Sequence, residues 1–122
     1  MDVVILGASD NRRRYANRAQ HKLVEHGHRV IPVNPNLKEV EGVPTISLDE
    51  VPDRVDTVTV YLGRDRLLPL VPALAASAPR RVILNPGADD PEVVQALESE
   101  GLNVQRACTL VLLDADRFDM VP

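Results

Sequence analysis

The sequence predicts an α/β fold: a doubly wound, mostly parallel sheet with helices on both faces, in one domain over residues 1–122. Short runs rich in valine, isoleucine and leucine, at residues 3–6, 30–33 and 81–84, alternate with stretches of helical periodicity. Unbroken apolar runs are typical of parallel strands, which helices cover on both faces. A chain of 122 residues can bury one core but has no room for a separate substrate domain.

The first strand and the turn after it are the most informative segment. Residues 3–6 are all apolar and lead directly into Gly7, Ala8 and Ser9. A turn of such small residues brings backbone N–H groups to the start of the next helix, which is a geometry that holds phosphates.

The next helix is predicted over residues 13–26, because its small and apolar side chains recur on one side. Gly27 suits the end of that helix. The second strand, residues 30–33, stops at Asn34 and Pro35, since proline donates no hydrogen bond to a sheet. These elements complete a β-α-β unit.

The middle of the chain predicts a second crossover. Residues 42–46 favour a short edge segment, and residues 47–50 resemble the start of a brief helix or turn. Residues 55–62 are rich in β-branched side chains and predict a central strand, with Gly63 as the turn after it. The following helix, residues 65–76, contains two prolines that should break or offset it.

The last third repeats the pattern. Residues 81–84 predict a strand that ends in the turn of residues 85–87. The helix of residues 90–100 starts with aspartate as its cap and proline in its first turn. Residues 103–105 predict a final parallel strand, and the apolar residues 110–113 pack on the sheet or on a partner.

Four loops therefore follow the carboxyl ends of strands: residues 7–9, 33–35, 62–64 and 85–87. The carboxyl ends of parallel strands meet at one rim of the sheet. In open α/β sheets ligands bind at this rim where the strand order reverses, so these loops are the expected site. Residues 85–87 are also explained by a simple turn.

Composition narrows the class of protein. The net charge is −4 and only three residues are aromatic, which argues against a nucleic-acid surface. No apolar run is long enough to cross a bilayer, and no leader segment precedes the first strand. The single cysteine, Cys108, excludes an internal disulfide and is expected to be buried and inert. Together these features predict a cytoplasmic protein.

Two common nucleotide motifs are missing. If the first glycine of the dinucleotide fingerprint is aligned on Gly7, Ser9 and Arg12 occupy its other glycine positions. The second strand ends in Asn34 and Pro35 instead of the acidic residue that holds the ribose of NAD. No P-loop sequence occurs either, so nicotinamide cofactors and P-loop chemistry are disfavoured.

Arg12, Arg13 and Arg14 lie between the first turn and the first helix. Such a run is often only a solvated helix start. However, positive charge opposes the helix dipole there, which favours an anion nearby. Three guanidinium groups that pair with phosphates would indicate a multiply phosphorylated ligand.

The sequence resembles small stand-alone bacterial CoA-binding domain proteins, which are similar to the amino-terminal CoA-binding domain of the succinyl-CoA synthetase alpha subunit. The residues that carry the resemblance are Val4 to Ser9, Asn11, Arg14, Leu23 to Pro35, Gly42, Val55, Asp56 and Tyr61. The chain departs from the family at residues 15–17, where Pro-Ser-Tyr is common, and at residues 62–64, where a more basic pair is common.

The resemblance implies a Rossmann-like sheet that binds CoA. It implies a ligand site made of Gly7, Ala8, Ser9, Asn11, Arg14, Val33, Asn34, Pro35 and Tyr61. In that site Gly7, Ala8 and Ser9 would lie at the diphosphate, with Arg14 on a phosphate. Tyr61 should be partly buried, since its ring can stack on adenine while its hydroxyl stays in water.

We expect a protein without catalytic residues, because the spacing gives no nucleophile–base pair, no carboxylate pair and no metal-ligand set. The leading hypothesis is binding of CoA or an acyl-CoA thioester for carriage, sensing or regulation. One alternative is a protein-interaction domain of the same fold that has lost its ligand, and a less favoured one is an NAD(P)-binding protein. Residues 110–113 are consistent with a homodimer or, equally, with core burial.

Overall fold

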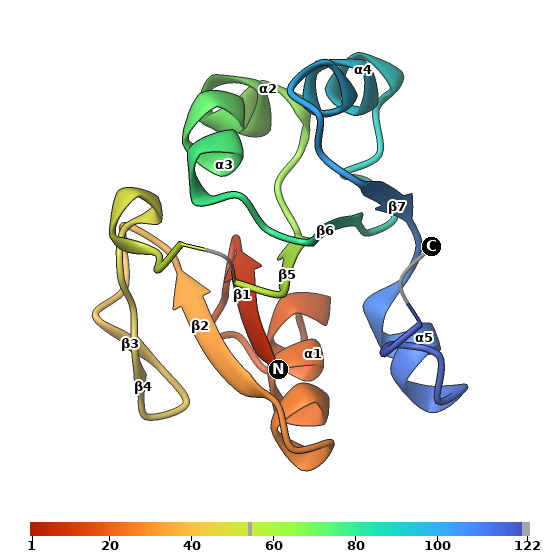
Figure 1. Cartoon of the computed structure of the whole chain (residues 1–122). Coiled ribbons are helices and arrows are strands. Elements are labelled where there is room, and N and C mark those ends of the chain that lie inside the picture. Colours follow the sequence, from red (N-terminus) through yellow and green to blue (C-terminus); the bar gives the residue numbers. More distant parts are fainter. Residues whose placement is uncertain (54, 121–122) are drawn as a thin grey trace.

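A computed structural model describes residues 1–53 and 55–120 and contains a five-stranded parallel sheet (Figure 1). The strands of this sheet, in their order across it, are β2 (Arg29–Val33), β1 (Asp2–Leu6), β5 (Thr57–Val60), β6 (Arg81–Leu84) and β7 (Val104–Arg106). A separate antiparallel pair is formed by β3 (Glu39–Val40) and β4 (Val43–Pro44). The prediction of a parallel sheet with a central strand near residue 58 is confirmed.

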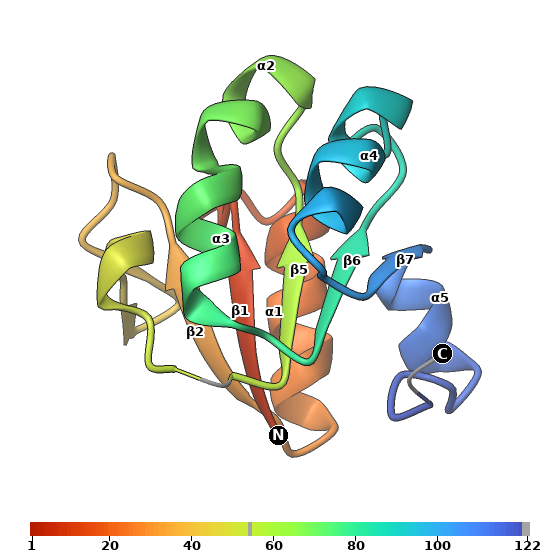
Figure 2. The same ribbon diagram turned by 45° about the horizontal axis from the view of Figure 1, so that its top comes forward.

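Helices cover both faces of the sheet, as predicted (Figure 2). The helices are α1 (Tyr15–Glu25), α2 (Arg64–Leu67), α3 (Val71–Ser77), α4 (Pro91–Ser99) and α5 (Thr109–Asp114), with 3-10 turns η1 (Leu48–Glu50) and η2 (Leu68–Leu70). α1 and α5 lie on one face, and α3 and α4 lie on the other. None of the helices within the described residues is long and apolar enough to cross a membrane.

Local sequence signals explain where several elements begin and end. The predicted break in the helix after β5 is present, because η2 carries Pro69 between α2 and α3. Asp90 caps α4 by accepting a hydrogen bond from the Glu92 N–H at 2.9 Å. α1 begins later than predicted, at Tyr15, because the Arg14 N–H donates to the Asn11 carbonyl in a turn before it.

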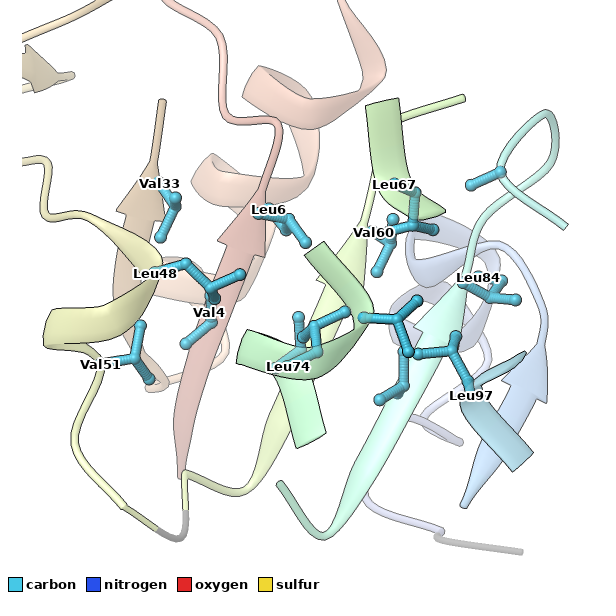
Figure 3. Close-up of a cluster of buried hydrophobic side chains, with 14 of the residues drawn as sticks. Val4, Leu6, Val33, Leu48, Val51, Val60, Leu67, Leu74, Leu84 and Leu97 are labelled. Carbon is cyan, nitrogen blue, oxygen red and sulfur yellow. The ribbon is translucent and has the colours of Figure 1, made fainter. Parts of the chain in front are cut away.

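The core consists of two apolar layers, one on each side of the sheet. Along β1, Val4 and Leu6 face one layer while Val3 and Ile5 face the other, as expected from the alternation of a strand. Figure 3 shows the first layer, whose labelled members are Val4, Leu6, Val33, Leu48, Val51, Val60, Leu67, Leu74, Leu84 and Leu97. Leu113 of α5 belongs to the second layer, so the apolar segment at 110–113 packs on its own sheet. Of that segment, Val111 is exposed.

At the amino edge of the sheet the protein buries a cation. The side chain of Arg81 is fully buried, and its Nε and Nη2 donate to the Thr57 hydroxyl at 3.1 and 3.0 Å. Its Nη1 donates to the Gln105 side chain at 3.1 Å, and its guanidinium lies 4.6 Å from the centre of the Phe118 ring. The Phe118 ring also packs against the His28 ring, with 5.1 Å between the ring centres. This cluster fixes the segment after α5 to the sheet.

The opposite, carboxyl edge contains the point where the strand order reverses. The chain leaves β1 toward α1 on one face, and it leaves β5 toward α2 and α3 on the other face. β1 and β5 are neighbours in the sheet, so the two connections diverge and leave a crevice between them.

Candidate functional site

A cleft of about 1080 Å³ lies at this reversal point. It lies along the carboxyl ends of β2, β1, β5 and β6, so all four predicted rim loops contribute to it. Eight of the nine sequence-predicted site residues line it: Gly7, Ala8, Ser9, Arg14, Val33, Asn34, Pro35 and Tyr61.

Gly7 is required by the packing of the rim. Its φ is +90°, and a Cβ atom built on it would lie 2.9 Å from Leu62 Cδ2 and 3.2 Å from the Tyr61 carbonyl carbon. The N–H groups of Gly7 and Ala8 both donate to the Val33 carbonyl, at 3.1 and 3.2 Å. These two amides therefore join the ends of β1 and β2 and are already used within the protein.

The two predicted asparagines have different roles. Asn34 lines the cleft and also joins two rim loops, because its Nδ2 donates to the Ala8 carbonyl at 2.7 Å. Asn11 is exposed and does not line the cleft. Its Oδ1 accepts from the Arg13 N–H at 3.0 Å and its carbonyl accepts from the Arg14 N–H at 3.0 Å, so Asn11 shapes the turn before α1.

The start of α1 opens into the cleft. No side chain caps this helix and its first turn carries no acidic residue, while Arg14 and Tyr15 line the cleft beside it. A helix N-terminus with free N–H groups and a partial positive charge is suited to an anion. The arginine run is not a three-residue clamp, however: Arg12 pairs with Glu41 at 3.4 Å, and only Arg14 of the three lines the cleft.

Tyr61 is half-buried, as predicted, but its hydroxyl does not lie in water. Burial raises the pKa of Tyr61 to about 12, against the effect of hydrogen bonds with the hydroxyls of Thr59 and Thr109. Asn85 completes this buried polar group, since its Nδ2 donates to Thr59 Oγ1 at 2.7 Å and its Oδ1 accepts from the Thr109 N–H at 2.8 Å. The ring of Tyr61 lines the cleft while its polar end anchors the start of α5.

Sequence reasoning missed one wall of the cleft. Residues 45–50, from β4 to η1, line the side next to β2, and the Ile46 N–H donates to the Pro32 carbonyl at 3.3 Å. The sequence signal for η1 was present, because Ser47 and Glu50 form a capping box. That this segment folds over the end of β2 is a tertiary feature with no local signal. Hydrogen bonds from Ser47 lower the pKa of Glu50, so this wall is acidic at neutral pH.

Part of the opposite wall was missed as well, although the loop after β6 was among the predicted rim loops. Arg66 of α2 and Leu70 of η2 line the cleft on the side of β5, together with residues 86–88 after β6. Arg66 lies one helical turn after Gly63, so the predicted helix was a signal from which its position near the rim could have been inferred.

Two other sequence expectations concern Cys108 and a metal site. Cys108 is partly exposed at the start of α5, where it was expected to be buried, and it is not among the residues that line the cleft. In the part of the chain that the structure describes, no group of three or more His, Cys, Asp or Glu side chains is arranged to hold a metal ion.

Solved structures share this fold over nearly the whole chain. A crystal structure of an uncharacterized protein has a TM-score of 0.89 and 38% sequence identity, covering 96% of this chain and 97% of that one. A dinucleotide-forming acetyl-coenzyme A synthetase from Candidatus Korarchaeum cryptofilum has a TM-score of 0.74 at 20% identity. That match covers 87% of this chain and 25% of the synthetase, and it shows likeness of fold.

Sequence comparison gives the family. The uncharacterized protein YneT of Bacillus subtilis (strain 168) is 30% identical over 66 residues, which are 53% of this chain and 49% of YneT. The chain thus matches about half the length of this curated relative. The family model of the CoA binding domain matches residues 2–114, which include every strand and helix described above. The resemblance seen in the sequence is confirmed, and the chain belongs to the CoA binding domain family.

Proposed function

We propose that this protein binds CoA or an acyl-CoA thioester in the cleft at the carboxyl edge of its sheet, and that it performs no catalysis of its own. One observation carries the proposal: eight residues expected from the family resemblance line a single cleft of about 1080 Å³. A cleft at the reversal point of an open α/β sheet is where nucleotides bind.

The start of α1 is the proposed site of the CoA diphosphate. This helix has 11 residues, an uncapped first turn and Arg14 at its N-cap position. Because the amides of Gly7 and Ala8 are already bonded to Val33, the donors offered to the diphosphate are the first N–H groups of α1 and the Arg14 guanidinium. Asn34 and Pro35 would contact the nucleoside beside it.

The absence of catalysis is proposed from the roles of the polar groups in the cleft. One hydroxyl–carboxylate contact occurs there, in which Ser47 Oγ donates to Glu50 Oε1 at 2.7 Å. The Ser47 N–H donates to the same oxygen at 3.0 Å, and these bonds lower the pKa of Glu50, which makes it a weak base. The pair therefore caps η1 and is a poor candidate for nucleophile and general base.

The proposed role is carriage, sensing or regulation in the cytoplasm, with a CoA thioester as the partner molecule. A homodimer stays a prediction. Its main support in the sequence, the apolar segment at 110–113, is weakened because Leu113 is buried in the protein's own core.

Thermal unfolding with increasing CoA, acetyl-CoA, NADH or ATP tests the proposal. A ligand that binds only the folded protein stabilises it by about 2.7 kcal/mol at a hundredfold excess over its Kd. We expect the midpoint to rise with CoA and acetyl-CoA and to stay constant with NADH and ATP.

The other outcomes are equally informative. A shift with NADH alone would contradict the proposal and support the nicotinamide alternative. No shift with any of the four ligands would favour the protein-interaction alternative. Enzymatic turnover of acetyl-CoA by the purified protein would contradict the non-catalytic part.

A further inference from the structure

Two arginines reach the cleft from opposite faces of the sheet. Arg14 precedes α1, which packs on the face that carries Val3 and Ile5. Arg66 lies in α2, whose Leu67 packs on the other face against the layer shown in Figure 3. The two guanidinium groups therefore reach the cleft from separate elements on the two sides of the reversal point.

Neither of these arginines has a carboxylate partner among the described residues. Elsewhere five arginines of this acidic chain pair with a carboxylate: Arg12 with Glu41, Arg29 with Asp2, Arg64 with Glu92, Arg80 with Asp56 and Arg106 with Asp89. In the described part of the chain Arg13, Arg18 and Arg117 also lack such a partner but lie outside the cleft, so the position of Arg14 and Arg66 in the cleft is what distinguishes them. Arg64 is the instructive neighbour, since it is two residues from Arg66 and its Nη2 lies 2.7 Å from Glu92 Oε1. Arg64, on the same helix but not among the residues that line the cleft, is thus paired with a carboxylate.

Charge is distributed unevenly along the cleft. Asp49 and Glu50 of η1 lie on the wall next to β2, where Leu48 packs beside Val33 (Figure 3). Arg66 lies on the wall next to β5. A ligand with a second anionic group, apart from its diphosphate, is repelled at the β2 side and attracted at the β5 side.

We propose that Arg66 is a second anion-binding residue, which selects ligands that carry an anionic group in addition to the diphosphate held at α1. This inference rests on the proposed function. Two parts of a CoA thioester supply such a group: the 3′-phosphate of the nucleotide and the terminal carboxylate of a dicarboxylic acyl chain. Both suit a guanidinium, which donates paired hydrogen bonds to phosphate or carboxylate oxygens.

The test compares wild type with Arg66→Gln by isothermal titration calorimetry against CoA, dephospho-CoA, acetyl-CoA and succinyl-CoA. Arg117→Gln is the control, because it removes the same charge from an exposed residue outside the cleft. Circular dichroism and thermal unfolding without ligand check that both variants are folded. Loss of one charge-assisted contact should weaken binding about tenfold.

The pattern of losses identifies the anion. If Arg66 binds the 3′-phosphate, Arg66→Gln weakens CoA and both thioesters about tenfold and leaves dephospho-CoA unchanged. If it binds an acyl carboxylate, the variant weakens succinyl-CoA alone. Equal losses for all four ligands, or none, would overturn the inference while the proposed function stands. Failure of the wild-type protein to bind any of them would overturn both.

Discussion

The arginines at the two edges of the sheet differ in burial and in their partners. At the amino edge Arg81 is fully buried and every guanidinium nitrogen donates to Thr57 or Gln105, with Phe118 against its face. At the carboxyl edge Arg14 and Arg66 line an open cleft, and no carboxylate among the described residues pairs with them. An arginine that serves the fold is satisfied by the fold, whereas cations that line a crevice without a carboxylate partner are suited to an anionic ligand.

The comparison predicts that substitutions at the amino edge affect stability and that those at the carboxyl edge affect binding. The largest effect is expected for Arg81→Ala. It leaves a cavity and removes the donors to Thr57 and Gln105, so the free energy of unfolding should fall by about 3–5 kcal/mol. Denaturant titration followed by circular dichroism measures this change.

The neighbouring Arg80→Ala is the matched control for that experiment. Arg80 is half-exposed and pairs with Asp56 at 2.6 Å, a contact expected to contribute about 0.5 kcal/mol. If the two variants lost similar stability, the contrast between a structural and an exposed arginine would be wrong.

Gly7→Ala should have the next largest effect. It tests a residue that lines the cleft and is also required by the packing of the rim. The new methyl group would contact Leu62 and Tyr61 at a φ of +90°, so we expect a loss of about 2–3 kcal/mol in unfolding free energy. Gly42→Ala isolates the backbone part, because Gly42 has a φ of +79° with no atom near the added methyl group. It should lose only about 1 kcal/mol. Equal losses would show that the close packing of the rim is unimportant.

Arg14→Gln should affect ligand binding and leave stability nearly unchanged. Arg14 is exposed and has no ion pair within the part of the chain described, so unfolding should change by less than about 0.5 kcal/mol. CoA binding should weaken about tenfold in calorimetry, because a charge-assisted contact to phosphate is lost. Arg13→Gln, next to it but outside the cleft, should leave the Kd nearly unchanged. If both variants weakened CoA binding equally, the result would support the three-arginine phosphate site suggested by the sequence.

These contrasts also explain how far the sequence predicted the structure. Periodicity and turn residues predicted the strands, the broken helix at Pro69 and the rim loops, because those features are local. Two residues differ from expectation: Asn11 lies outside the cleft and its polar groups are used by its own turn, and the hydroxyl of Tyr61 bonds with Thr59 and Thr109. Whether a polar group is free for a ligand or is used in the protein's own hydrogen bonds depends on packing, so it cannot be inferred from the residue type.

Two parts of the cleft walls, residues 45–50 and Arg66, were missed for the same reason. Segment 45–50 lines the site only because β4 lies against the edge strand β2, where Pro32 offers a carbonyl and no N–H. In the sequence Arg66 resembles any exposed arginine. The structure shows that Arg64, on the same helix, pairs with a carboxylate, whereas Arg66 lines the cleft and has no such partner among the described residues. Whether an arginine has a carboxylate partner, and whether it lines the cleft, depends on the folded arrangement and is not given by the sequence.

The smallest predicted effect concerns His28 at the amino edge. Burial lowers the pKa of His28 below its ordinary value of 6.5, and the amino group of Met1, 3.3 Å from Nδ1, lowers it further, while Asp119 raises it. The folded protein therefore takes up this proton at lower pH than the unfolded chain. Stability should be fully retained above about pH 6.5 and decline as the pH falls below it.

His28→Gln should make unfolding less dependent on pH between about pH 5 and 7.5, since the titrating group is gone. His26→Gln is the comparison variant, because His26 is exposed and lies in the same loop after α1. Its charge is a minor cause of the lowered pKa of His28, so its loss should change the slope less than the loss of His28 itself. Thermal midpoints across this range measure the difference in slope. An unchanged slope in His28→Gln, or a wild-type protein that gains stability on acidification relative to that variant, would contradict the assignment. A smaller slope confined to His28→Gln would show that burial of the imidazole at the amino edge opposes its protonation, in contrast to the cleft, where the charged side chains of Arg14 and Arg66 are exposed.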